Sequence, residues 1–409
     1  MASDDLPGAY VDMVAALNQA VADGVDVINF SIGGYGVLGG TLELAMLNAA
    51  KAGVFISAAA GNEGPDSVSH LAPWGTTVAA STHDTGYRTT LTLGNGTSRT
   101  GVGVVASAAP SAPLVDAARA ARSGVAADDA ERCLPGTPDP EKVTGAIVLC
   151  EHIFGDSREG KADQVEEADG VGMVLHNVAA PVDTAFAFRQ AVPTVYLTSG
   201  QAEAVKAYAA RAGSRATAKL SAARAVSQRA PEVVRFSSGG PGPLHGGVLK
   251  PDITAPGLDT IAGTARDSEF AKGAQGLMSG TSSSAPQVAG LALVLRGLHP
   301  DWSPAEVKSA LMTTATTTDN KGRPIRRSGA EATKRVGRHS ADVPGPGCRA
   351  RSCRTSHAVR VWWPCACCPG RDWPLRPGAN SVKGWKGRGV PLPPIPEIPM
   401  VPPVRPEVR

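Results

Sequence analysis

The 409-residue sequence contains no apolar run of the roughly 18 residues that a membrane-spanning helix requires, so we expect no membrane segment. Residues 1–10 hold neither a basic cluster nor an apolar stretch, and we therefore expect no signal peptide in this chain. Aromatic residues make up only 4%, although 42% of the residues are hydrophobic. This composition is typical of a soluble globular protein whose core is built from Ala, Val, Leu and Gly.

Charge is divided unevenly along the chain, although the formal net charge is only +3. Residues 321–409 contain 18 Lys and Arg against 5 Asp and Glu, whereas residues 1–320 contain 22 and 32. Five of the seven cysteines and four of the six tryptophans also lie in the last segment. The break near residue 320 indicates two stretches of different origin or different selection.

Residues 9–80 alternate between helical and strand patterns. The apolar periodicity predicts helices over 10–22 and 42–52, and buried strands over 25–32 and 54–60. Helix, strand, helix and strand at this spacing indicate an α/β fold with a parallel sheet covered by helices.

Residues 89–230 have a different pattern. Leu91 and Leu93 alternate with Thr before Gly94-Asn95-Gly96, which predicts a hairpin turn. We expect a smaller α/β or β-rich insert, with strands over 145–150, 172–176 and 194–197 and a helix over 201–211. Residues 231–318 return to the first pattern, with a strand-like segment over 233–237 and helices over 283–298 and 304–314.

Residues 279–290, which read SGTSSSAPQVAG, join small residues to a predicted helix start. Ser282 would lie at the helix N-terminus, where free N–H groups and the helix dipole favour a developing anion. Pro286 is tolerated in the first turn of a helix. Taken alone, this segment is more typical of an ordinary Ser-rich helix cap. An α/β-hydrolase elbow is excluded, because Ser284 stands where that motif needs Gly.

Three more segments accompany this one in the same chain. Residues 27–34 read VINFSIGG, residues 58–65 read AAAGNEGP, and residues 249–257 read LKPDITAPG. Together and in this order, over roughly residues 10–320, the four resemble the signatures of subtilisin-like serine proteases, the subtilases. The resemblance implies a subtilisin-like parallel sheet with helices on both faces.

The resemblance also implies roles for particular residues. Ser282 would be the nucleophile, and the side chain of Asn62 would donate to the oxyanion. The substrate backbone would be bound by Ser31, Ile32, Gly33, Gly34, Ala60 and Gly61.

The insert refines the resemblance. Residues 145–150 (GAIVLC) and 170–177 (GVGMVLHN) are similar to strands of a protease-associated domain, which is characteristic of plant-type subtilases. That similarity implies a disulfide between Cys133 and Cys150, which fits an oxidising compartment; two unrelated thiols are the alternative. Asn95 begins a glycosylation sequon on a predicted turn, which is compatible with secretion.

These features divide the chain into four parts. Residues 1–104 and 231–320 would form the catalytic domain, 105–230 the protease-associated insert, and 321–409 an atypical tail.

The other two triad members are not recognisable in the sequence. Subtilases order the triad as Asp, His, Ser, with the first two before the strand that here spans 25–32. None of the eight histidines lies in a His-Gly-Thr-His run. His83-Asp84-Thr85-Gly86 comes after the Asn62 segment, which is the wrong order, and we interpret it as a loop because neighbouring side chains on an extended chain point apart.

Two function classes follow from these residues. The first is a serine endopeptidase that acts on proteins or peptides, is truncated in this chain and is therefore inactive alone. The second is a non-catalytic peptide-binding remnant or pseudo-protease. For the full-length family member the resemblance implies secretion, with no cofactor, no metal and no nucleic-acid or membrane partner.

The family pattern is also broken at single positions and in the tail. Gln287 stands where the family usually has His, Ser283 replaces the usual Met, and Gly239 replaces an Arg of plant-type members. A zinc site or nucleic-acid binding in the tail is an alternative to disorder or an out-of-frame translation, but the cysteine spacing matches no regular zinc finger. The tail residues concerned are Cys348, Cys353, His357, Cys365, Cys367 and Cys368.

Overall fold

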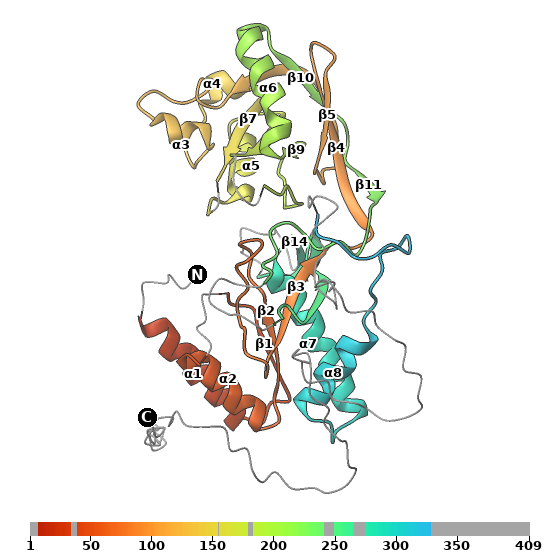
Figure 1. The fold of residues 1–409 in the computed structure, drawn as a ribbon. Coiled ribbons are helices and arrows are strands. Elements are labelled where there is room, and N and C mark those ends of the chain that lie inside the picture. Colours follow the sequence, from red (N-terminus) through yellow and green to blue (C-terminus); the bar gives the residue numbers. More distant parts are fainter. Residues whose placement is uncertain are drawn as a thin grey trace, which may run out of the picture. The chain divides into compact units, whose positions relative to one another are not determined.

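The computed structural model describes residues 7–33, 39–153, 155–178, 183–240, 249–265 and 275–328. Gly34 and the whole tail after residue 328 lie outside the described residues, so the expectations for them stay predictions. The helices and strands of the described part are labelled in Figure 1.

A parallel sheet combines strands from two distant parts of the chain. In the described part its order is β1-β2-β3-β12, with Ile28 opposite Ile56 and Ile253 opposite Val78. The predicted α/β core with a parallel sheet is therefore confirmed. The strands are β1 (Val27–Phe30), β2 (Phe55–Ala59), β3 (Thr76–Ser81) and β12 (Ile253–Pro256).

Helices cover both faces of this sheet, because successive side chains of a strand point to opposite sides. Ile56 of β2 packs in one apolar cluster with Leu17 and Met46 of the two N-terminal helices. Phe55, its neighbour, packs in another cluster with Val288 of the helix that carries Ser282. The helices are α1 (Pro7–Ala22), α2 (Thr41–Lys51), α7 (Thr281–Leu298) and α8 (Pro304–Thr314).

Residues 85–227 form a second, mixed sheet. Its order in the described part is β11-β4-β10-β6-β7-β8-β9, and β5 forms the expected hairpin with β4. Strands β6 to β9 are parallel, whereas β10 and β11 run antiparallel to β4. The strands are β4 (Thr85–Leu93), β5 (Ser98–Gly101), β6 (Ala109–Asp116), β7 (Ile147–His152), β8 (Gly172–Asn177), β9 (Thr194–Leu197), β10 (Thr217–Leu220) and β11 (Arg224–Ser227).

Shorter elements complete the described part. A third sheet pairs β13 with β14. These elements are α3 (Ala127–Glu131), α4 (Pro140–Val143), α5 (Arg158–Glu167), α6 (Ser199–Ala212), a 3₁₀ turn (Gly213–Arg215), β13 (Thr260–Gly263) and β14 (Gln275–Met278).

Two features differ from the sequence-based expectation. The hairpin before residue 104 pairs with strands beyond it, Leu93 with Ala218 and Thr85 with Ser227, so the mixed sheet begins at residue 85 rather than 105. No strand forms over 233–237 in the described structure. Val233 makes only isolated bridges, to Ser81 and Arg327.

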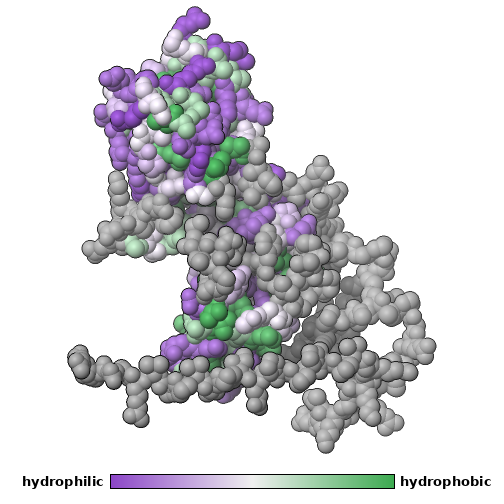
Figure 2. Space-filling view, turned by 90° about the vertical axis from the view of Figure 1, so that its left-hand side faces the viewer, coloured by the Kyte–Doolittle hydropathy of each residue, from purple (hydrophilic) through white to green (hydrophobic). Residues whose placement is uncertain are grey.

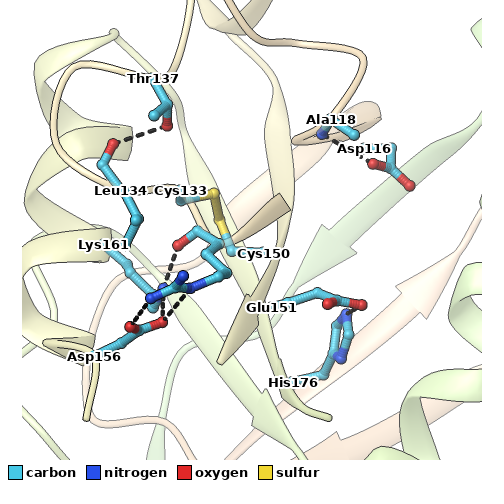
Figure 3. Close-up of a disulfide and its surroundings, with 11 residues drawn as sticks. Asp116, Ala118, Cys133, Leu134, Thr137, Cys150, Glu151, Asp156, Lys161 and His176 are labelled. Atoms are coloured by element: carbon cyan, nitrogen blue, oxygen red, sulfur yellow. Dashed lines mark hydrogen bonds and ion pairs between the residues drawn. A yellow bond between two sulfur atoms is a disulfide. The ribbon is translucent and has the colours of Figure 1, made fainter. Parts of the chain in front are cut away.

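Cys133 and Cys150 are joined by a disulfide, with their Cα atoms 5.7 Å apart (Figure 3). Beside it, the carboxylate of Asp156 contacts both Arg132 and Lys161, whose side chain is 1% exposed. Burial alone would raise the pKa of Asp156, but hydrogen bonds from the two cations lower it to about 2. The ion group thus holds α5 beside the disulfide.

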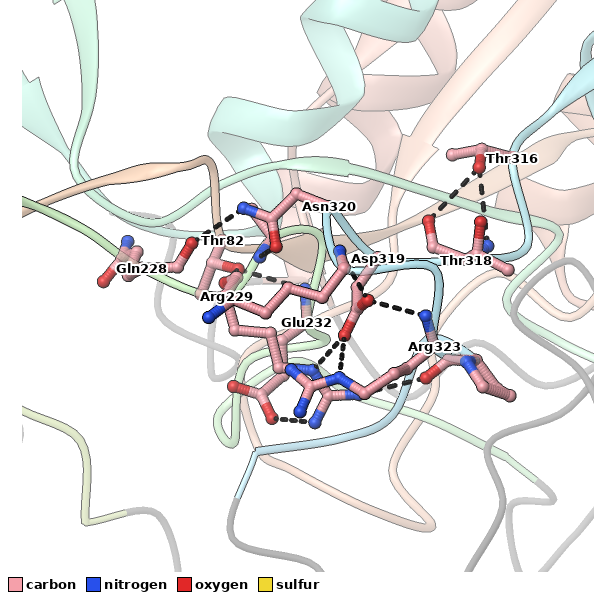
Figure 4. A network of polar contacts seen from close by, with 12 residues as sticks. Thr82, Gln228, Arg229, Glu232, Thr316, Thr318, Asp319, Asn320 and Arg323 are labelled. Atoms are coloured by element: carbon pink, nitrogen blue, oxygen red, sulfur yellow. Dashed lines mark hydrogen bonds and ion pairs between the residues drawn. The ribbon is translucent and has the colours of Figure 1, made fainter.

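A second polar network surrounds Asp319 (Figure 4). Its buried carboxylate accepts hydrogen bonds from the side chains of Arg229 and Arg323, and from the backbone N–H of Lys321 and Arg323. Asn320 donates to the carbonyl of Gln228. Residues 319–323 are therefore tied to the segment that follows β11.

On the face shown in Figure 2, hydrophilic residues predominate towards the top, and hydrophobic residues gather lower down. No helix of the described residues is long and apolar enough to cross a membrane.

Candidate active site

Ser282 is the second residue of α7, directly after Gly280 and Thr281. Gly280 has φ +152°, a conformation that favours glycine, and it leads from β14 into the helix. The hydroxyl of Ser282 donates to the carbonyl of Ser31 at 3.0 Å, and the hydroxyl of Ser31 donates to the carbonyl of Ser282 at 3.0 Å. The two serines therefore hold each other through a reciprocal pair of hydrogen bonds.

The second of these bonds compensates for a proline. Pro286 lies in the second turn of α7, not in the first as expected, because the helix begins at Thr281. Proline has no N–H to bond the carbonyl four residues earlier, which is that of Ser282. The hydroxyl of Ser31 takes this position, and Asn29 Nδ2 donates in turn to Ser31 Oγ at 3.0 Å.

Asn62 lies at the same helix start. Its Oδ1 accepts from the backbone N–H of Thr281 at 2.9 Å and is 3.1 Å from Thr281 Oγ1. A backbone N–H can only donate, so the side-chain atom facing it is the oxygen. The contact therefore uses the oxygen of the Asn62 side chain and not its two N–H hydrogens.

Ala60 and Gly61 use their backbone N–H groups inside the protein. Ala60 N donates to Val78 O, and Gly61 N donates to Thr281 Oγ1 at 3.1 Å. Their carbonyls accept hydrogen bonds from the backbone N–H of Ser69 and Ser238, and the Gly61 carbonyl also lies 3.2 Å from Thr281 Oγ1. A carbonyl oxygen has two lone pairs, so these contacts occupy both on Gly61 and one on Ala60.

Gly257 allows the close approach that places the helix start. Its carbonyl accepts from Gly280 N at 2.8 Å. A Cβ at this position would lie 2.7 Å from both Ala80 Cβ and Gly280 O, and nearer still to Ser284 Oγ. Only glycine fits this position without moving Ala80 of β3 or the backbone of Gly280, directly before α7.

The approach to Gly257 is held by buried charges. Asp252 accepts from Lys250 Nζ at 2.5 Å and from Thr77 N at 2.8 Å, and it pairs with Lys308 of α8 at 2.9 Å. Burial lowers the pKa of Lys250 to about 8, against the opposing effect of Asp252. This group connects α8 to the N-terminal ends of β12 and β3, whereas Gly257 follows the C-terminal end of β12.

The Ser282 hydroxyl donates to the Ser31 carbonyl, and none of the described histidines is hydrogen-bonded to it. His83 Nε2 lies 3.1 Å from the carbonyl of Asp259, while Asp84 accepts from Thr85 Oγ1. His83 and Asp84 lie between β3 and β4, and both side chains contact Thr85, the first residue of β4. Among the described residues no group of three or more His, Cys, Asp or Glu side chains is placed to hold a metal ion.

One residue pair near the site was missed from the sequence. His70 Nε2 lies 2.7 Å from the carbonyl of Ile32, and His70 Nδ1 lies 3.3 Å from Glu43 Oε1. The partners come from three separate segments, so no local pattern could have indicated the contact.

The positions that depart from the family pattern have partners of their own. Gln287 Nε2 donates to the carbonyl of Pro256 at 2.6 Å. Beside Gly239, the guanidinium of Arg327 fills the space and donates to Ser237 O at 2.6 Å. The guanidinium of Arg327 therefore takes the space that a side chain at position 239 would enter.

Comparison with known proteins decides the family. The subtilase family (Peptidase_S8) matches residues 1–333. The chain belongs to the subtilase family. Among its curated relatives, subtilisin-like proteases SBT1.6 and SBT1.3 of Arabidopsis thaliana are 36% and 38% identical over 330 and 335 residues.

Each match covers 77% of this subtilase chain but only 43% and 42% of the relatives, so the chain spans less than half of their length. A solved psychrophilic protease, S41, matches 80% of this chain and 62% of its own at 18% identity, with a TM-score of 0.34. The family assignment rests on the sequence match and not on this structural likeness.

Proposed function

We propose that this subtilase chain carries the nucleophile side of a serine endopeptidase. One observation supports this most directly: Asn62 is hydrogen-bonded to the residue before Ser282, at the N-terminus of a helix. In the proposed site the hydroxyl of Ser282 would be the nucleophile and the N–H groups of Asn62 the oxyanion donors. A cap serine with a purely structural role would not need that donor.

In the proposed reaction, Ser282 Oγ attacks the carbonyl carbon of a peptide bond and gives its proton to a base. The carbonyl oxygen becomes an oxyanion, to which Asn62 Nδ2 donates and toward which the N-terminal dipole of α7 points. When the tetrahedral intermediate breaks down, the base returns the proton to the leaving amine, and an acyl-enzyme remains on Ser282. Residues 31–34 would hold the substrate backbone as an added strand.

The base and its orienting carboxylate complete the mechanism. We propose that both come from sequence outside these 409 residues, which is consistent with relatives more than twice as long as the matched segment. Without a base, the Ser282 hydroxyl donates a hydrogen bond to the carbonyl of Ser31, and a carbonyl is too weak a base to remove the proton. In subtilisin, loss of triad members lowers turnover by about 10⁶, so we expect negligible activity from the chain alone.

The mixed sheet, the disulfide and Asn95 support a second part of the proposal. We propose that residues 85–227 are a protease-associated insert and that the parent enzyme is secreted. The disulfide would persist in an oxidising compartment. Asn95 lies exposed on the β4–β5 turn, where an oligosaccharide would meet no packed surface.

The test uses the 409-residue chain with a fluorophosphonate probe and added imidazole as a substitute base. We expect no labelling without imidazole, and labelling at Ser282 with it. Ser282→Ala should abolish the label, and Asn62→Ala should slow it by about 10²–10³, the range measured for the corresponding donor in subtilisin. Ser283→Ala, one residue away, is the matched control and should label normally.

Three outcomes separate the alternatives. Rapid labelling without imidazole would show that these residues already contain a base. Labelling that survives Ser282→Ala would remove Ser282 as the nucleophile. A well-folded chain that never labels, yet binds peptides, would establish the non-catalytic peptide-binding function instead.

A further inference from the structure

We propose that His70, supported by Glu43, is a positioning residue that presents the segment 31–33 to a bound peptide. The inference rests on the proposed function, because it assigns the element that sets the shape of the same peptide-binding segment. His70 acts through the backbone of Ile32 and touches neither Ser282 nor the substrate.

The contact has a defined direction. His70 is 4% exposed, and its Nε2 lies 2.7 Å from the carbonyl of Ile32. A carbonyl oxygen can only accept, so Nε2 carries a hydrogen and donates it. The ring edge also packs against Phe30, at 5.3 Å between centroids and 87° between planes. The imidazole therefore contacts the end of β1 and the residues after it through one polar and one apolar contact.

Successive carbonyls of the segment face different parts of the protein. The carbonyl of Ser31 accepts from Ser282 on α7, whereas the carbonyl of Ile32 accepts from His70. Gly33 lies against the loop after β2, since a Cβ there would be 3.7 Å from Gly61 Cα. Because successive carbonyls of an extended segment point to opposite sides, the contact at Ile32 leaves the side of the Ser31 carbonyl, which faces Ser282, for an added strand.

Glu43 fixes the orientation of the imidazole. Its Oε1 lies 3.3 Å from His70 Nδ1, and Glu43 is 1% exposed. With Nδ1 facing Glu43 and Nε2 facing the carbonyl of Ile32, both ring nitrogens have a partner. Glu43 thereby orients the ring that holds Ile32.

The backbone of His70 is itself held in an uncommon conformation. Its φ is +54°, in the left-handed region that few residues other than glycine adopt. Thr77 Oγ1 donates to the carbonyl of His70 at 2.6 Å and secures this conformation. Such strain persists where the surroundings impose it, and it is common at binding sites. This backbone conformation thus directs the imidazole of His70 towards the carbonyl of Ile32.

The experiment compares two replacements of similar size in the Ser282→Ala chain. His70→Gln keeps an N–H donor near the Nε2 position, whereas His70→Met fills the volume without one. With fluorescein-labelled casein as the probe, we expect His70→Met to raise the Kd about ten-fold and His70→Gln to stay within about two-fold. His83→Met removes another imidazole–carbonyl contact, away from the segment, and should leave the Kd unchanged.

Hydrogen exchange at the amides of residues 31–33 separates this inference from the proposed function. Faster exchange in His70→Met, restored in His70→Gln, would support the positioning role even if casein does not bind, in which case the proposed function alone fails. Equal exchange and equal Kd in both variants would overturn the inference. A Kd that rises equally in both variants would also overturn it, because the donor would then not matter.

Discussion

Ser31 and Ser282 illustrate how one residue compensates for another that is distant in sequence. The carbonyl of Ser282 has no helical partner because Pro286 lacks an N–H, and Ser31 Oγ supplies the missing hydrogen bond. The same exchange brings Ser31 O to the hydroxyl of Ser282. A proline that would otherwise weaken the helix thus connects the nucleophile to the peptide-binding segment.

A double-mutant cycle tests this compensation. Ser31→Ala should destabilise the chain by about 1–3 kcal/mol, because it leaves a partly buried carbonyl without its partner. In a Pro286→Ala background the new N–H serves the same carbonyl, so Ser31→Ala should cost clearly less there. Urea unfolding of the four proteins gives the coupling energy, and Ser31→Thr, which keeps the hydroxyl, should behave like the parent. Strictly additive effects would refute the compensation.

Gly257 gives a second prediction for a single residue. Gly257→Ala should destabilise the chain by about 1–3 kcal/mol, since the new methyl group overlaps Ala80, Ser284 and the backbone of Gly280. Gly290 of α7 is the matched control: it is exposed, and a Cβ there meets no atom within 4 Å. Gly290→Ala should therefore stabilise the helix, by up to about 1 kcal/mol. Equal thermal midpoints for the two variants would contradict the close approach at Gly257.

Among the elements, local signals predicted some boundaries well. Residues 304–314 were predicted as a helix, and α8 has these bounds, because Ser303 and Glu306 form a capping box around Pro304. The helix predicted over 283–298 begins two residues earlier in the structure, at Thr281, because Gly280 is its N-terminal cap. The Ser282–Asn62 proximity followed from the family resemblance, whereas the contacts between Glu43, His70 and Ile32 join distant segments that carry no shared pattern.

The Asp319 network predicts acid sensitivity. Burial alone would raise the pKa of Asp319, but the backbone N–H groups of Arg323 and Lys321 and the guanidinium groups of Arg229 and Arg323 lower it overall. The unfolded chain therefore takes up this proton first as the pH falls below about 4, and the stabilisation is lost in that range. We expect Asp319→Asn to lower the Tm by about 2–4 °C at pH 7.

The pH dependence supplies the control for that variant. The difference in Tm between the parent and Asp319→Asn should shrink as the pH falls from 5 towards 2. A difference that stays constant over this range would show that the charge of Asp319 does not stabilise the fold.

The disulfide predicts a redox-dependent stability. Cys133 and Cys150 are 17 residues apart. A cross-link that closes a loop of this length reduces the conformational entropy of the unfolded chain and so stabilises the fold by about 3 kcal/mol. The Cys133→Ser, Cys150→Ser variant should lose about that much in urea unfolding. Adding dithiothreitol should lower the stability of the parent to the same level and leave the variant unchanged. A parent that is insensitive to reductant while its bridge is broken would contradict this account.

At the scale of the whole molecule, α7 has an unusual surface. Leu291, Leu293, Val294 and Leu298 are 54–67% exposed, and Arg296 is the only charged residue in the helix. A helix that is apolar on all sides is normally buried on all sides. Its inner side packs on the parallel sheet, so the outer side presents apolar surface to solvent.

We therefore expect the isolated chain to self-associate at micromolar concentrations through this helix. Leu291→Lys with Leu298→Lys should shift light scattering towards the monomer without loss of helical circular dichroism. Leu249→Lys with Ile261→Lys adds the same charge at exposed apolar positions outside α7, and should leave the association in place. If both pairs act alike, net charge rather than this helix would govern association.

The way in which the mixed sheet joins the chain has an evolutionary consequence. Its first and last strands are neighbours, with Thr85 opposite Ser227, so the chain leaves β3 and returns towards β12 through adjacent positions. A module with adjacent ends can be gained or lost without rethreading the strands around it. Recombination in this lineage would need to change the chain only at these two adjacent ends. The parallel sheet next to Ser282 would keep its strand order with or without the module.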